Sequence, residues 1–173
     1  MQKGHRSLFF KIHKQQINRR IVKKEEEMKE TLAIASDHAG YEMKLALIAY
    51  LKEKGYGISD LGTFSSAAVN YPDFGHPLAE AVESGQFRLG ISLCGSGNGI
   101  NMVTNKHQGI RSALCWNKEI SKMARYHNDA NICSLPARYI DLETAKEIVD
   151  VFLETGYEGG RHDIRISHIP IQK

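Results

Sequence analysis

Short apolar runs alternate regularly with amphipathic stretches from residue 31 onward, and this alternation limits the fold more than any other feature of the chain. The runs predict five strands, within residues 31–36, 56–61, 88–94, 109–115 and 131–135. The stretches between and after them have helical periodicity, at residues 41–54, 72–84, 100–106, 118–127 and 142–155. Strands that are apolar throughout and alternate with helices form parallel sheets covered on both faces. We therefore expect an α/β fold, a three-layer α/β/α Rossmann-like sandwich around a five-stranded parallel sheet.

The charge of the 173-residue chain divides unevenly at residue 28. Residues 1–28 carry eight of the 23 basic side chains and three of the 20 acidic ones, which leaves 15 basic and 17 acidic side chains in residues 29–173. The second segment has the size of one ordinary domain, and its charge gives no reason to expect a nucleic-acid partner. We expect one domain at residues 29–173, preceded by an N-terminal extension at residues 1–28.

The extension has three interpretations, and none of them requires a fold. It lacks the compact apolar region and the cleavage site of a secretory signal. The favoured interpretation is a disordered segment or a start-site artefact, because Met28 stands directly before the first predicted strand. A mitochondrial-type presequence is the second, since no acidic residue precedes Glu25. Nucleic-acid binding is the weakest, because no aromatic stacking platform accompanies the basic side chains.

Cysteine content and hydropathy limit the class of protein. The three cysteines, Cys94, Cys115 and Cys133, are odd in number. They lie about twenty residues apart, which suits neither a disulfide framework nor a zinc site. Cys115 and Cys133 fall in apolar runs and are expected in the core. No run approaches the ~18 consecutive apolar residues of a membrane span. We expect a cytoplasmic protein with no membrane-spanning segment, metal ion or other cofactor.

Polar and glycine residues are concentrated where the predicted strands end. Residues 36–40 have the sequence SDHAG after the first strand, and residues 94–99 have the sequence CGSGNG after the third. Ligands of open α/β sheets bind beyond the carboxyl ends of the strands, so a site is expected at these segments.

The segment at residues 94–99 predicts an anion-binding turn. Its glycines let the backbone turn tightly and direct several N–H groups at one point, next to the following helix. The positive ends of these N–H groups and of the helix also stabilise a negative charge on Cys94, and this favours the reactive thiolate. The alternative is a tight turn after a buried, inert cysteine. Three other motifs fail, because Ile100 stands where a dinucleotide fingerprint needs Gly and a cysteine phosphatase loop needs Arg, and Ser96 stands where a P-loop needs Lys.

Ionisable residues outside this turn have both a chemical and a structural interpretation. Asp37 and His38 can exchange protons with a substrate, or Asp37 can cap the next helix. His127 can act as an acid or base, or can stabilise the end of its helix. Arg161 and Arg165 share a face if they are helical, and then either clasp a phosphate or face solvent.

Taken together, these segments resemble the type B family of ribose-5-phosphate isomerases, which includes galactose-6-phosphate and allose-6-phosphate isomerases. The resemblance spans residues 31–165 in the family's order, and residues 1–27 have no counterpart. The matching segments are SDHAG at 36–40, NYPD at 70–73, CGSGNG at 94–99, NK at 105–106, GIR at 109–111, HNDAN at 127–131, AR at 137–138 and GGRH at 159–162 with Arg165.

The resemblance implies an isomerase that interconverts D-ribose 5-phosphate and D-ribulose 5-phosphate through an enediolate, in the non-oxidative pentose phosphate pathway. It implies that Cys94 is the base that moves the proton between C2 and C1, and that the glycine turn holds the enediolate oxygen. The implied roles of the other residues are support of the enediolate (Ser96, Gly95, Gly97, Asn98, Gly99), positioning and opening of the furanose (Asp37, His127), lining of the sugar (Tyr71, Asn128) and anchoring of the phosphate (His38, Arg138, Arg161, His162, Arg165).

The resemblance also implies a homodimer, or a tetramer made of two such dimers, with a C-terminal helix that carries arginines to the partner subunit's site. Some members place a Glu base directly after the glycine turn; Ile100 stands there in this chain, which leaves Cys94 as the candidate base. Asn70 replaces a common Asp, and Pro136 replaces an expected Gly, which puts the placement of Arg138 in question. Two alternative functions stay open: an isomerase of allose or galactose 6-phosphate, and a non-catalytic sugar-phosphate binding module.

Overall fold

The computed structural model describes residues 29–171, and the extension interpreted above lies outside them. The five predicted strands are confirmed as β1 (Thr31–Ser36), β2 (Gly57–Asp60), β3 (Gly90–Cys94), β4 (Ser112–Leu114) and β5 (Ile132–Pro136). The helices are the 3-10 turn η1 (His38–Gly40), α2 (Tyr41–Glu53), α3 (Pro72–Glu83), α4 (Asn98–Thr104), α5 (Lys118–Asn128), α6 (Leu142–Glu154) and α7 (Arg161–Ser167).

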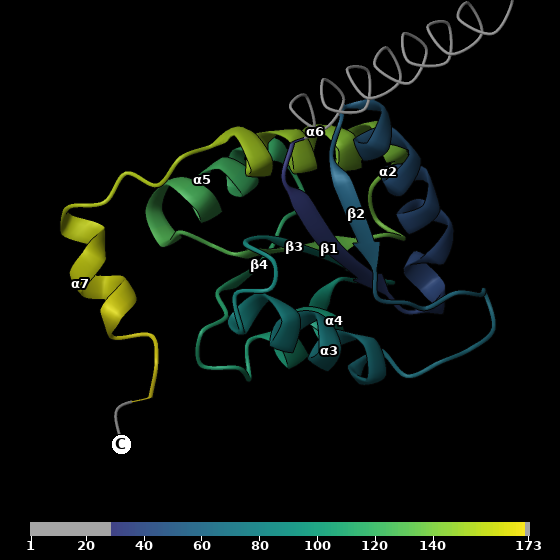
Figure 1. The fold of residues 1–173 in the computed structure, drawn as a ribbon, viewed down its shortest axis with the longest axis horizontal. Coiled ribbons are helices and arrows are strands. Elements are labelled where there is room, and N and C mark those ends of the chain that lie inside the picture. The colour runs from purple at the N-terminus through teal and green to yellow at the C-terminus, as the bar shows by residue number, and fades with distance from the viewer. Residues whose placement is uncertain (1–28, 172–173) are drawn as a thin grey trace, which may run out of the picture.

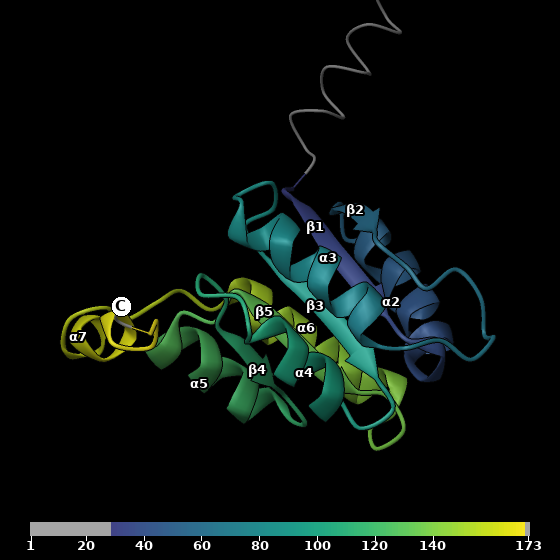
Figure 2. The same cartoon turned by 90° about the horizontal axis from the view of Figure 1, so that it is seen from below.

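The strands form one sheet in the order β2-β1-β3-β5-β4, and every ladder is parallel. Helices α2, α5 and α6 cover one face of this sheet, and α3 and α4 cover the other (Figures 1 and 2). The predicted three-layer sandwich is thereby confirmed. The chain moves in opposite directions across the sheet after β1 and after β3, so the switch point, where such folds bind ligands, lies between these two strands.

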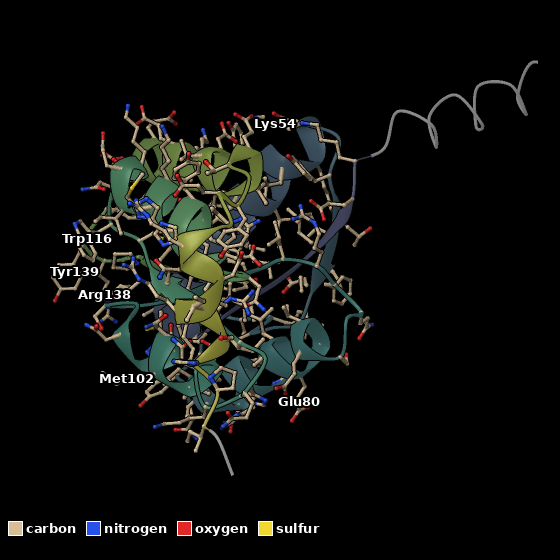
Figure 3. The ribbon with its side chains drawn as sticks, turned by 90° about the vertical axis from the view of Figure 1, so that its left-hand side faces the viewer. Lys54, Glu80, Met102, Trp116, Arg138 and Tyr139 are labelled. Carbon is tan, nitrogen blue, oxygen red and sulfur yellow. The ribbon has the colours of Figure 1, made fainter. Side chains whose placement is uncertain are left out.

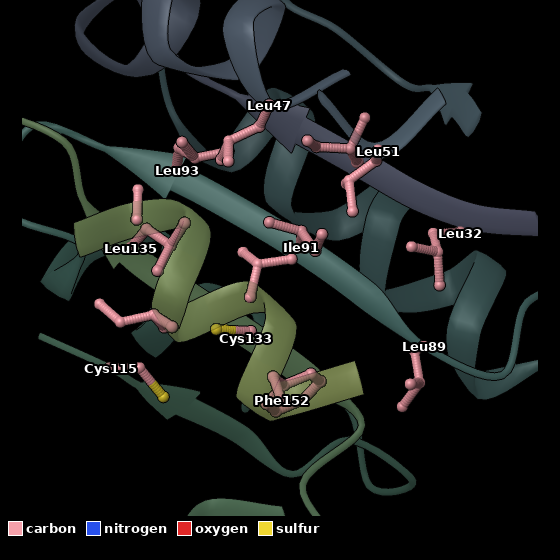
Figure 4. Close-up of a cluster of buried hydrophobic side chains, with 14 of the residues drawn as sticks. Leu32, Leu47, Leu51, Leu89, Ile91, Leu93, Cys115, Cys133, Leu135 and Phe152 are labelled. Atoms are coloured by element: carbon pink, nitrogen blue, oxygen red, sulfur yellow. The ribbon is translucent and has the colours of Figure 1, made fainter. Parts of the chain in front are cut away.

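The two faces of the sheet differ in the size of their side chains, because successive residues of a strand point to opposite faces. In β1, Leu32 belongs to the larger core cluster with Phe152 of α6, whereas Ala33 belongs to the smaller cluster with Leu78 of α3. Figure 4 shows the larger cluster, in which side chains of the strands, such as Ile91 and Leu135, lie on the same face of the sheet as Phe152. Full burial of such a side chain contributes about 1.5–3 kcal/mol, so these clusters fix how the strands are arranged.

Strand β4 has three residues, although the sequence predicts a strand over residues 109–115. Two backbone N–H groups before it bind side chains instead of a neighbouring strand. Glu83 accepts a hydrogen bond from the Gly109 N–H at 2.8 Å, and Asn131 accepts one from the Arg111 N–H at 2.8 Å. The Gly109 hydrogen bond also holds the pKa of the Glu83 carboxyl below its ordinary value. The ladder therefore begins only after Arg111.

Side chains cap the start of two helices. The Asn117 side chain accepts a hydrogen bond from the Ile120 N–H, and the Asp141 side chain accepts one from the Thr144 N–H. Each such cap stabilises a helix by about 1 kcal/mol relative to Ala. The longest helices in residues 29–171, α2 and α6, have 13 residues each, and none in this range has the length and apolar character that crossing a membrane requires.

Candidate active site

The turn at residues 94–99 follows β3 directly. Cys94 is the last residue of β3 and is 4% exposed. The carbonyl groups of Cys94 and Gly95 accept hydrogen bonds from the N–H groups of Ala137 and Arg138, both at 3.0 Å. Within residues 29–171, the N–H groups of residues 95, 96 and 97 have no hydrogen-bond partner. The turn is thus anchored through its carbonyl groups and leaves N–H groups available beside the thiol.

Geometry requires two of the glycines in this turn. Gly97 has a φ of 74°, and a Cβ atom there would lie 2.4 Å from Leu114 Cδ1. At Gly99, a Cβ atom would lie 2.8 Å from Cζ of Tyr71. The Tyr71 ring therefore packs directly on the turn, where the sequence predicts a residue that lines the sugar. The Ser96 hydroxyl accepts a hydrogen bond from the Asn98 N–H at 3.3 Å, which links two further predicted residues.

The exit of β1 lies beside this turn. The Asp37 N–H donates to the carbonyl group of Leu93 at 3.1 Å, which ties the exits of β1 and β3 together. The Asp37 carboxylate accepts hydrogen bonds from the N–H groups of Ala39 and Gly40, at 2.9 and 3.1 Å. The capping interpretation of Asp37 is confirmed for the 3-10 turn η1, whereas α2 begins after Gly40 without a side-chain cap. The cap also holds the carboxylate and His38 at the switch point.

Arg138 follows β5 and reaches the same turn. Its Cδ and Nε atoms lie 3.4 and 3.5 Å from the position that a Cβ atom on Gly95 would take. Pro136, the last residue of β5, pairs with Cys94, and the Arg138 N–H still binds the Gly95 carbonyl group. The departure from the family at Pro136 therefore leaves Arg138 against the turn. In Figure 3, Arg138 lies on the same edge of the molecule as the exposed Trp116 and Tyr139.

Two of the cysteines have no place at this site. Cys115 and Cys133 are fully buried, as predicted. Burial raises the pKa of the Cys133 thiol well above its ordinary value. Of the three thiols, Cys94 is the one that directly precedes the turn and its free N–H groups.

A second group of predicted residues gathers where α5 ends and α7 begins. The imidazole rings of His127 and His162 are stacked, with centroids 4.5 Å apart. Glu158 Oε2 lies 3.1 Å from His162 Nε2 and 4.0 Å from His127 Nε2. Arg161 and Arg165 follow on α7, which is helical as the phosphate interpretation requires. Helix α7 packs against α5 and stands away from the sheet (Figures 1 and 2).

The two groups lie at opposite ends of the sheet. Asn131, which follows α5, accepts a hydrogen bond from the Gly90 N–H at 2.9 Å, so α5 ends beside the amino end of β3. Cys94 lies at the carboxyl end of that strand. Four residue steps of about 3.3 Å put these ends roughly 13 Å apart. His127 and Asn128 therefore lie with the arginines of α7, and a single chain does not bring them to Cys94.

The sequence predicts no cluster of metal ligands, yet the structure contains a group with suitable atoms. One ligand atom each of His127, Glu158 and His162 lie within 4.8 Å of one another. However, Arg161 Nε donates a hydrogen bond to His162 Nε2 at 3.2 Å, so a guanidinium group occupies the lone pair that a metal ion needs. The cluster does not favour a metal site. Glu158 is the member that sequence reasoning missed, although it lies four residues before His162.

Comparison with known proteins gives the family of the chain. The sequence model of the Ribose/Galactose Isomerase family matches residues 32–169. The chain belongs to this family. One relative is ribose-5-phosphate isomerase B of Escherichia coli (strain K12), which is 40% identical over 138 residues. The match covers 80% of this chain and 93% of the relative.

Solved structures named ribose-5-phosphate isomerase B share the fold of this family member. The protein of Clostridium thermocellum is 45% identical with a TM-score of 0.79, covering 80% of this chain and 94% of its own. The protein of Mycoplasma genitalium, with bound ribulose 5-phosphate, is 38% identical with a TM-score of 0.78, covering 82% and 95%. The family predicted from the sequence motifs is thereby confirmed.

Proposed function

We propose that this member of the ribose/galactose isomerase family interconverts D-ribose 5-phosphate and D-ribulose 5-phosphate. One observation carries the proposal: the Cys94 thiol stands at the switch point of the sheet beside N–H groups, at residues 95–97, that have no partner in the described part of the chain. Relatives named ribose-5-phosphate isomerase B, one of them with bound ribulose 5-phosphate, support this choice of substrate.

The proposed reaction moves a proton between neighbouring carbon atoms. The Cys94 thiolate takes the proton from C2 of the open-chain aldose, and the electrons of that bond form the enediolate. The N–H groups of the turn and the Ser96 hydroxyl stabilise the enediolate oxygen; one such donor contributes on the order of 100- to 1000-fold in rate. The thiol returns the proton to C1 while the hydroxyl proton passes from O2 to O1, so the atoms balance. Ile100 is buried and aliphatic, so it offers no competing base.

The proposed site is completed by a second copy of the chain. Within one chain, His127 lies at the end of the sheet opposite to Cys94. A partner subunit in a homodimer, or in a tetramer made of two such dimers, would bring the end of its α5 and its α7 to the turn. The proposed roles then divide between two chains. One chain supplies the base, the turn and the nearby contacts (Cys94, Gly95, Ser96, Gly97, Asn98, Gly99, Asp37, His38, Tyr71, Arg138), and the other supplies the rest (His127, Asn128, Arg161, His162, Arg165).

A coupled assay of the purified protein with three substrates tests the proposal. We expect the highest kcat/KM for ribose 5-phosphate, compared with allose 6-phosphate and galactose 6-phosphate. A higher kcat/KM for either hexose phosphate would instead identify a hexose 6-phosphate isomerase. Absence of turnover with all three substrates would contradict the proposed isomerase activity. The remaining alternative would then be a non-catalytic sugar-phosphate binding module.

A single variant separates the base from the binding site. In C94A, kcat should fall by about 100- to 10,000-fold, the usual contribution of a positioned acid or base. Binding of ribose 5-phosphate, measured by calorimetry, should remain within a few-fold of wild type, since the contacts that hold the phosphate are unchanged. Full activity in C94A would refute the assignment of Cys94 as the base.

A further inference from the structure

The segment between β2 and α3, residues 61–71, is joined to the end of β1 by backbone hydrogen bonds. The Ser36 N–H donates to the Gly62 carbonyl group at 2.6 Å, and the Thr63 N–H donates to the Ser36 carbonyl group at 2.7 Å. Ser36 directly precedes Asp37 and His38. The position of this segment is therefore coupled to the part of the proposed site that follows β1.

A fully buried lysine on α2 binds the same segment. Lys44 on α2 is 0% exposed, and its Nζ donates to Asp60 Oδ1 at 2.5 Å and to the Thr63 carbonyl oxygen at 2.6 Å. The ammonium group also lies 5.3 Å from the centre of the Phe64 ring. Burying a charge is unfavourable unless it is paired and hydrogen-bonded, so these contacts must form together. Lys44 thus fixes α2, the end of β2 and the segment 61–71 relative to one another.

The far end of the segment determines which nitrogen of His38 carries the proton. The Val69 N–H donates a hydrogen bond to His38 Nδ1 at 3.3 Å. A backbone N–H group can only donate, so Nδ1 is the accepting nitrogen and the neutral ring carries its proton on Nε2. In the described part of the chain, His38 Nε2 has no hydrogen-bond partner. Two residues after Val69, the Tyr71 ring packs on Gly99 of the turn.

We propose that the segment 61–71 holds His38 in the Nε2–H tautomer, so that its ring donates a hydrogen bond to an anionic phosphate of the substrate, and that Lys44 is a positioning residue for this contact. The inference rests on the proposed function, because it names how one phosphate anchor of that site works. The opposite tautomer would direct a lone pair at the phosphate and repel it. The Val69 amide therefore prepares the ring for an anion before the ligand arrives.

The tautomer of His38 can be measured without an assay of enzyme activity. A long-range proton–nitrogen correlation spectrum of the uniformly ¹⁵N-labelled full chain distinguishes protonated from unprotonated ring nitrogens, and H38Q identifies the His38 signals by their loss. We expect the proton on Nε2 near neutral pH, and a shift of the Nε2 signal when inorganic phosphate is added. A proton on Nδ1, or no response of His38 to phosphate, overturns the proposal even if the protein is an active isomerase.

Two matched variants test the amide of residue 69. V69P removes the N–H group and V69A keeps it, at the same partly buried position. V69A should retain the Nε2–H tautomer, whereas V69P should show a mixture of the two ring tautomers. A V69P spectrum identical to that of wild type, with the native fold confirmed by circular dichroism, overturns the role of the amide.

The role of Lys44 is tested by K44M, with the exposed K52M on the same helix as its control. The double variant K44M/D60N removes both charges, so a folded protein is available if K44M alone does not fold. KM for ribose 5-phosphate should rise by roughly 10-fold, the effect of losing one charge-assisted hydrogen bond, with kcat within about threefold of wild type. An unchanged KM, or an equal loss in kcat, in a folded variant overturns the positioning role. If the wild-type enzyme does not turn over this sugar, the proposed function fails, and the His38 spectrum still decides the tautomer.

Discussion

The turn at residues 94–99 and the group around His127 are held in place differently. The turn lies between buried strands, and its neighbours Leu93, Ile100 and Leu135 are fully buried. The His127 group depends on α7, which packs against α5 and exposes 68% of Ile164. One region is therefore positioned by the core of its own chain, whereas the other stands at the edge of the molecule.

The difference between the two regions matches their proposed tasks. A base and an oxyanion turn must be held within a fraction of an ångström of the reacting atoms, and a densely packed core provides such precision. Arginines of α7 that bind the phosphate in a neighbouring chain's site must instead project from the domain. Exposed apolar side chains beside the arginines, such as Ile164, are typical of a surface that a partner covers. The four predictions that follow test this contrast, from the largest expected effect to the smallest.

Mixing two inactive variants gives the largest effect. C94A removes the proposed base, and R161A weakens phosphate binding by the arginines of α7 by roughly 10- to 100-fold, the value of one or two charged hydrogen bonds. If each site uses both chains, random exchange makes half of the dimers mixed, and each mixed dimer has one intact site. The mixture should then regain about a quarter of wild-type activity in the coupled assay. No recovery, despite subunit exchange shown by mass spectrometry, would contradict the shared site.

Substituting a glycine of the turn should damage both stability and catalysis. Gly97 and Gly85 both have positive φ values, 74° and 79°, but a Cβ atom would lie 2.4 Å from Leu114 at Gly97 and would contact nothing within 4 Å at Gly85. G85A should cost about 1–2 kcal/mol, the penalty of the left-handed conformation. This lowers Tm by about 2–8 °C without affecting kcat. G97A should cost more and also lower kcat; equal Tm shifts and unchanged kcat in both variants would show that the turn adapts.

The end of α5 depends on one carboxylate. Asp129 has a φ of 43° and pairs with Arg125 Nη1 at 2.7 Å and Arg111 Nη2 at 2.9 Å. D129N tolerates the left-handed conformation but removes the charge opposite the buried Arg125, so the free energy of unfolding should fall by about 1–3 kcal/mol. Thermal unfolding measures the change, and E154Q, at an exposed position, should stay within about 0.5 kcal/mol. An equally stable D129N would show that the His127 group is held by other contacts.

The smallest effect concerns, at high pH, the contact of α7 with the segment 155–160, which joins α6 to α7. Desolvation, together with the hydrogen bond to Asp163, raises the pKa of Tyr157 to about 12. A raised pKa in the folded state means that the contribution to stability is complete below the unfolded pKa near 10 and is lost as pH rises through about 12. Tyrosinate absorbance should therefore show a late step that Y157F removes and Y139F, at an exposed position, retains. The hydrogen bond to Asp150 also raises the pKa of Tyr50, so the measurement is made in a Y50F background, where a late step that persists in Y157F would contradict the assignment.

Much of the proposed site follows from local patterns in the sequence. The glycine turn after Cys94 and the cap at Asp37 depend on residues close together in the chain, so their form is predictable from spacing alone. Lys44 shows where such reasoning stops. Its spacing from Leu47 and Leu51 places it on the apolar face of α2, but only the folded chain shows that Asp60 and the Thr63 carbonyl group compensate its charge.

The sequence by itself determined the order of strands and helices along the chain, the family and the candidate residues for the chemistry, because periodicity and short motifs are local properties. Only the tertiary structure decided which of those residues meet. It placed Tyr71 and Arg138 at the turn with Cys94 and bound His38 to Val69, and it placed His127 and Arg161 at the other end of the sheet. The reason is physical: contacts between distant segments depend on how whole layers pack, and the packing of buried side chains fixes that arrangement cooperatively.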